Sequence, residues 1–77
     1  MTVERELEEQ ELTEFLDAWL GGLPKEDRVL FLRRYWNGEE VKMLAGEYGV
    51  PPGRMAKRMY RLRQDLRSAL EKEGYLL

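Results

Sequence analysis

Apolar residues recur along this chain at the spacing of one helix face, and glycine or proline interrupts each run. From Leu12 to Leu20 they fall at i, i+3, i+4, i+7 and i+8, which is the pattern of an amphipathic helix. Gly21 and Gly22 follow this run and can end the helix. No segment alternates apolar and polar residues as a half-buried strand does. The pattern therefore predicts an all-α fold.

Three further helices follow the same logic. Pro24 suits the first turn of the second helix, and Gly38 closes it. Gly49 can adopt the left-handed conformation that ends the third, and Pro52 can open the fourth. Four helices are predicted, over about residues 4–20, 25–36, 40–48 and 53–71, in a single domain spanning 1–77. The last two and their tight turn form a predicted helix-turn-helix over about residues 40–70.

The last predicted helix carries a narrow apolar stripe, with positive charges beside it. The stripe contains Met55, Met59, Leu62, Leu66 and Leu70, which are interpreted as core residues. Arg54, Lys57, Arg58 and Arg61 lie about a third of a turn away. Because the stripe must face the core, these four residues must face outward, with Arg58 nearest the edge of the core. Tyr60 lies on the same exposed arc.

Charge is distributed unevenly along the chain. The net charge is −2, but residues up to Val50 hold 12 acidic and 6 basic side chains, whereas those from Pro51 hold 7 basic and 3 acidic ones. Such asymmetry is typical of a chain whose basic end meets a polyanion. The alternative is a helix whose solvated face happens to be basic. If the polyanion is DNA and about four of its phosphates are neutralised, the logarithm of the affinity should fall against the logarithm of the salt concentration with a slope of roughly −3.6.

The composition excludes several classes of chemistry. The chain has no cysteine and no histidine, so disulfides, thiolate metal sites and histidine general bases are absent. It also has no phosphate-cradling glycine loop, and we expect neither an enzyme nor a cofactor. No apolar run approaches the roughly 20 residues that a membrane span needs. A reducing, cytoplasmic setting without membrane contact is the simplest expectation.

Two segments resemble a known family. The sequence LPKEDRVLFLRRYWNG is similar to the signature that opens region 4 of bacterial RNA polymerase sigma factors, most of all the extracytoplasmic-function type. The segment after it resembles the helix-turn-helix of that region. Where the family usually has Ile-Ala, Gly-Ile and Gly-Thr-Val-Lys-Ser-Arg, this chain has Leu44-Ala45, Gly49-Val50 and Gly53 to Arg58. The resemblance runs from about Leu12 to Leu70.

The resemblance implies recognition of the −35 promoter element, in double-stranded DNA, by the fourth helix. It places Ala56, Lys57, Tyr60 and Arg61 at positions that face bases, and Arg54 and Arg58 at positions that mostly hold phosphates. Lys42, at the start of the third helix, is a further candidate for a phosphate contact, with a solvated position as the alternative. The family domain also docks on the flap of the polymerase β subunit through an apolar groove. Anti-sigma factors cover the same surfaces in some members.

The chain departs from the family pattern in three places. Pro51 stands where a capping residue is usual, so no side chain should satisfy the first amides of the last helix. Ala56 stands where a polar or basic base reader is common. No counterpart of region 2, which binds the −10 element, is present. We therefore expect either the C-terminal domain of a longer factor, which the ending LEKEGYLL favours, or a stand-alone relative.

For several residues the sequence leaves two interpretations open. Trp19, Phe31, Tyr35 and Trp36 are interpreted as core aromatics, with the lining of a polymerase-binding groove as the alternative. Arg33 and Arg34 either touch the DNA backbone or form a solvated helix end. For the whole chain, the alternatives to a sigma domain are a helical protein-interaction module, such as an anti-sigma or adaptor protein, and a stand-alone or response-regulator helix-turn-helix.

Overall fold

The computed structural model describes the backbone of residues 3–75 and the side chains of residues 9–75. Its helices are α1 (Val3–Gly21), α2 (Lys25–Tyr35), α3 (Val41–Tyr48) and α4 (Pro52–Lys72). Over residues 3–75 there is no strand, so the predicted all-α class is confirmed. Each helix begins and ends within one residue of the predicted bounds.

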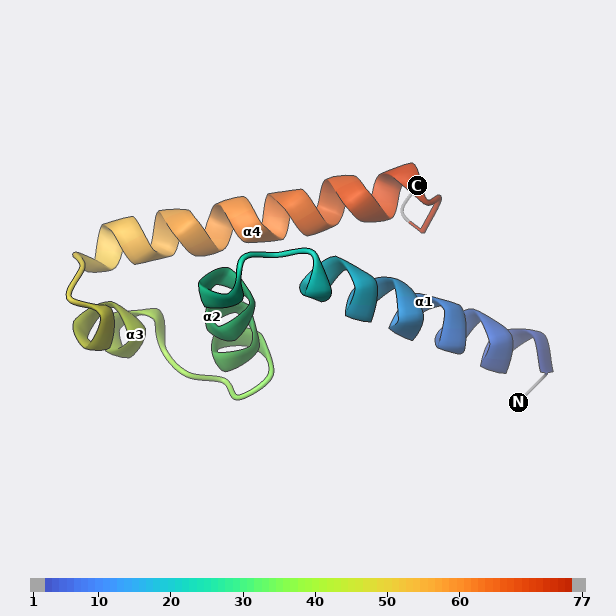
Figure 1. The fold of residues 1–77 in the computed structure, drawn as a ribbon, viewed down its shortest axis with the longest axis horizontal. Coiled ribbons are helices and arrows are strands. Elements are labelled where there is room, and N and C mark those ends of the chain that lie inside the picture. The colour runs from blue at the N-terminus through green and yellow to red at the C-terminus, as the bar shows by residue number, and fades with distance from the viewer. Residues whose placement is uncertain (1–2, 76–77) are drawn as a thin grey trace.

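The molecule is elongated, with extents of 46 × 22 × 20 Å. The long helix α4 runs along its length, and α2 and α3 lie against the N-terminal half of α4 (Figure 1). The first helix, α1, leads away from α2, so that its N-terminus lies far from the other three helices (Figure 1). The compact part of the fold is therefore the α2–α3–α4 unit that contains the helix-turn-helix.

The hydrophobic core is small and draws on α2, α3 and α4. Its buried side chains are Leu30, Leu44, Ala45, Met55, Met59 and Leu62, each at most 5% exposed. The predicted stripe on α4 is thus confirmed as core for its first three members, while Leu66 and Leu70 are half-buried. Since this stripe faces α2 and α3, the opposite side of α4 must face solvent.

The turn between α3 and α4 is fixed by backbone hydrogen bonds. Gly49 has a φ of 67°, the left-handed conformation predicted for it. Its N–H donates to the carbonyl oxygen of Gly46 at 3.3 Å, and the N–H of Val50 donates to that of Ala45 at 3.0 Å. These two bonds satisfy carbonyl groups at the end of α3, and Val50 packs against the core. The angle at which α4 leaves α3 is therefore set locally.

Proline starts α4 as the sequence predicts. Pro51 is extended, with φ −62° and ψ 143°, and Pro52 is the first helical residue. No side chain caps this end, as expected for a chain with proline at position 51, where the family usually has a capping residue. The N–H groups of Arg54 and Met55 donate instead to the carbonyl oxygen of Pro51, at 3.0 and 3.1 Å. The first amides of α4 are thus satisfied by the backbone and not by a capping side chain.

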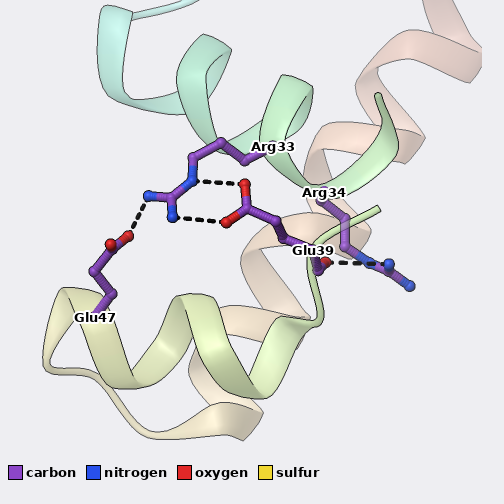
Figure 2. A network of polar contacts seen from close by, with 4 residues as sticks. All are labelled: Arg33, Arg34, Glu39 and Glu47. Carbon is purple, nitrogen blue, oxygen red and sulfur yellow. Dashed lines mark hydrogen bonds and ion pairs between the residues drawn. The ribbon is translucent and has the colours of Figure 1, made fainter. Parts of the chain in front are cut away.

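A network of hydrogen bonds and ion pairs joins α3 to the end of α2 (Figure 2). The guanidinium of Arg33 donates two parallel hydrogen bonds to the carboxylate of Glu39, at 2.9 and 2.8 Å, and a third to Glu47 on α3. Arg34 donates to the backbone carbonyl oxygen of Glu39 at 3.3 Å. The hydrogen bonds from Arg33 hold the pKa of Glu39 below its usual range. Arg33 is thus engaged within the fold, as neither of its two sequence interpretations foresaw.

The two methionines Met59 and Met43 give a matched test of the core. Met59 is 2% exposed and Met43 is 70% exposed. Replacing Met59 by alanine should lower the free energy of unfolding by about 2–5 kcal/mol. The same replacement at Met43 should change it by less than about 0.5 kcal/mol. Urea unfolding followed by circular dichroism measures both, and equal losses would contradict the assigned core.

Glu39 should make the stability depend on pH at the acidic end. Because its pKa is lowered in the folded state, its contribution is fully present above the unfolded value of about 4.3 and is lost as the pH falls through the folded value. Glu39→Gln should therefore lower the urea midpoint at neutral pH, and the gap from the unaltered chain should narrow below about pH 4. The neighbouring exposed Glu40→Gln is the control. A gap that stays constant with pH would show that the charge of Glu39 contributes nothing.

Candidate nucleic-acid interface

The N-terminal half of α4 presents a basic surface to solvent. Arg54, Lys57 and Arg61, called the basic face below, are all exposed. None of the three makes an ion pair or hydrogen bond with a side chain in the described part of the chain. Their orientation agrees with the outward direction that the apolar stripe predicts. Three positive charges on successive helical turns are therefore available to an external ligand.

Other predicted contact residues share this exposed side of α4. Ala56 and Tyr60 are exposed, with Tyr60 at 54%. The guanidinium of Arg63 lies 6.0 Å from the centre of the Tyr60 ring, within the range of a cation–π contact. Arg63 is not among the contact residues predicted from the sequence, although it follows Tyr60 at i+3, a spacing that brings helical side chains together.

Arg58 is set apart from the basic face. Its side chain is 31% exposed and turns toward the first turn of α2. Nε and Nη2 donate to Oδ1 of Asp27, at 2.8 and 2.6 Å, and Nη1 donates to Oε1 of Glu26 at 3.0 Å. Burial lowers the pKa of Arg58, but the hydrogen bonds to Asp27 and Glu26 outweigh that effect, and its pKa is raised. The residue links α4 to α2.

No local sequence signal reveals this link. Glu26 and Asp27 lie 32 and 31 positions before Arg58, and the first turn of a helix favours acidic residues for its dipole alone. Only the packing of α2 against α4 brings the three side chains together. The spacing along α4 by itself therefore groups Arg58 with Arg54, Lys57 and Arg61.

Lys42 lies on a different helix from the other candidates. It occupies the first turn of α3, is exposed, and makes no ion pair with a described residue. The α3–turn–α4 unit is held by its own core contacts, so Lys42 keeps a fixed place relative to the basic face. It is a cation that the fold leaves open to a ligand.

A second surface feature is an apolar groove of about 710 Å³ between α1 and α2. Its apolar lining residues are Leu16, Trp19, Leu20, Phe31, Leu32, Tyr35 and Trp36. The interpretation of the four aromatics as core is wrong for Trp36, which is 85% exposed, and for Tyr35, which is 40% exposed. Trp19 and Phe31 are half-buried and meet edge to face, with ring centres 5.1 Å apart.

The origin of this groove is the loose packing of α1. None of the side chains from Glu9 to Gly21 is buried, although α1 carries the apolar stripe that starts at Leu12. The ring contacts Trp19–Phe31 and Phe15–Tyr75 join α1 to the rest of the fold. A helix with an apolar stripe normally buries that stripe, so the half-covered stripe of α1 leaves room for a further apolar surface.

Within residues 3–75, no helix has both the length and the apolar character to cross a membrane. Among the side chains of residues 9–75, no three acidic groups come close enough together to hold a metal ion.

Comparison with known proteins leaves the family unassigned. No protein-family model matches the chain, and no curated protein matches its sequence. The function is therefore inferred from the geometry and the residue chemistry of the two surfaces.

Proposed function

We propose that this chain is the DNA-binding domain of a sigma factor, and that it recognises the −35 promoter element through α4 and docks on RNA polymerase during transcription initiation. The observation that carries the proposal is the basic face. Arg54, Lys57 and Arg61 are exposed and unpaired on the helix that directly follows a tight turn. A second helix that enters the major groove with its N-terminal residues is how helix-turn-helix proteins read DNA.

The chemistry of the basic face suits this role. Lys57 and Arg61 would donate hydrogen bonds to O6 and N7 of guanine, the acceptors that lysine and arginine prefer in the major groove. Ala56 and the ring of Tyr60 would contact a thymine methyl group. Arg54, near the positive end of the helix dipole, would contact phosphates, and Lys42 would add a phosphate contact from α3.

The apolar groove supplies the second half of the proposal. Binding of an amphipathic helix in a hydrophobic groove is a recurrent mode of protein recognition, and exposed tryptophans are favoured as its anchors. We assign the groove to the flap-tip helix of the polymerase β subunit. An anti-sigma factor would compete for the same surface or for the basic face.

One other function is favoured by a specific observation. The exposed Trp36 and the half-covered α1 suit a helical interaction module that binds a protein and never reads DNA. Such a module would need no unpaired cations on α4. DNA binding therefore separates the two functions.

Substitutions on α4 test the DNA-reading role. Lys57→Ala or Arg61→Ala should each cost about 1–3 kcal/mol on a duplex that carries the recognised element. The loss should be smaller on a scrambled duplex of the same composition, because only base contacts depend on sequence. Fluorescence anisotropy at low salt measures the affinities. Arg67→Ala, an equal charge change in the C-terminal half of α4, is the control.

Backbone amide NMR locates the DNA on the unaltered chain. We expect shifts centred on residues 54–61, larger with the recognised duplex than with the scrambled one. Equal losses on both duplexes for Lys57→Ala would contradict its reading role. An absence of shifts in α4 with every duplex would favour the interaction module.

Trp36 tests the docking role separately. Because its side chain is 85% exposed, Trp36→Ala should leave the fold intact. It should weaken binding to a peptide of the flap-tip helix by at least about 2 kcal/mol, as expected for a tryptophan anchor. Val29→Ala, on the helix that ends just before Trp36 but outside the groove, should have no such effect. Isothermal titration calorimetry measures both, and equal affinities for the two variants would argue against the groove as the docking site.

A further inference from the structure

The first turn of α2 lies beside the DNA-reading helix and carries two carboxylates. Glu26 and Asp27, called the acid pair below, engage three N–H groups of Arg58 at 2.6–3.0 Å. The guanidinium has five such groups in all. Asp27 is 22% exposed and Arg58 31% exposed, so both are partly withdrawn from solvent.

This arrangement changes what Arg58 offers to DNA. Two negative charges surround one positive charge, so the local sum is negative. A phosphate that approached Arg58 would have to displace two short, charge-assisted hydrogen bonds to Asp27 and would meet the repulsion of both carboxylates. Asp65 and Arg61 line the same cleft as Asp27 and Arg58, so Asp65 adds to that repulsion and Arg61, which is bonded to neither carboxylate, offsets part of it. The basic face has no such neighbours bonded to it.

We propose that the acid pair holds Arg58 out of contact with DNA phosphates, and so lowers the sequence-independent part of the affinity. The inference rests on the proposed DNA-binding function. Each neutralised phosphate strengthens binding to every duplex alike, whereas base contacts strengthen binding to one sequence. Withholding one cation therefore weakens binding to every duplex by about the same factor, so that less of the protein is held on non-specific DNA while the preference for one sequence is kept. Glu26 and Asp27 are positioning residues, because they act through Arg58.

The salt dependence of binding distinguishes this role from a purely structural one. The logarithm of affinity falls against the logarithm of salt concentration with a slope proportional to the number of phosphates neutralised. Loss of a structural link between α2 and α4 would lower stability without adding a phosphate contact. The double variant Glu26→Gln/Asp27→Asn keeps oxygen acceptors for Arg58 but removes both negative charges.

The experiment compares this variant with the unaltered chain on a scrambled duplex, by fluorescence anisotropy over a series of salt concentrations. The slope should become steeper by about 0.9, the value for one additional phosphate. Adding Arg58→Ala to the variant should restore the original slope. Arg58→Ala alone should leave the slope of the unaltered chain unchanged.

A charge-matched control removes the effect of net charge. Glu11→Gln/Glu14→Gln neutralises two exposed carboxylates on α1 and changes the net charge by the same amount. An equal change of slope in both double variants would overturn the inference. So would a slope shallower by about 0.9 for Arg58→Ala alone. If neither the unaltered chain nor any of its variants bound a duplex, the proposed function and the inference would both be overturned.

A second measurement needs no substitution and so does not depend on the folding of a variant. The Nε–H of Arg58 donates to Asp27, and its NMR resonance reports that bond. The resonance should keep its position as duplex is added, while backbone amides of the basic face shift. Movement of the Arg58 resonance together with those amides would show that Arg58 leaves Asp27 for the DNA, and would overturn the inference.

Discussion

The burial of the α4 stripe is the constraint on which the rest of the structure depends. Met55, Met59 and Leu62 pack against Leu30, Leu44 and Ala45, and these six residues are the buried core of the described chain. Burial of one side of a helix fixes its rotation about its own axis. The rotation of α4 in turn decides which of its charges meet solvent and which meet α2. The proposed DNA-binding surface is thus a direct consequence of a very small core.

The two arginine-centred networks each join α2 to a neighbouring helix, but they differ in their consequences. Arg33 binds Glu39 and Glu47 and joins α2 to α3, while Arg58 binds Glu26 and Asp27 and joins α2 to α4. Partly exposed ion pairs of this kind contribute modestly to stability, but they give α2 two fixed neighbours. The second network also lies beside the basic face. An interaction that orients helices therefore shapes the electrostatics of the proposed DNA contact.

The first helix, α1, is packed less tightly than α4. Its apolar stripe is only half covered by the aromatic contacts with Phe31 and Tyr75, and a groove opens between α1 and α2. In the proposed function this exposed apolar surface binds the polymerase, while the basic face of α4 binds DNA. Two surfaces of unlike character on one small fold suit a domain that joins two partners.

The sequence by itself determined the helices, their bounds within one residue, the glycine that ends α3 and the proline that opens α4, because these depend on local periodicity and backbone conformation. It also determined the outward direction of Arg54, Lys57 and Arg61, since an apolar stripe fixes the opposite face. Tertiary structure alone decided the partners of Arg58 and Arg33 and the exposure of Trp36. Those outcomes depend on which residues distant in sequence are brought together when helices pack, and no spacing along one helix encodes them.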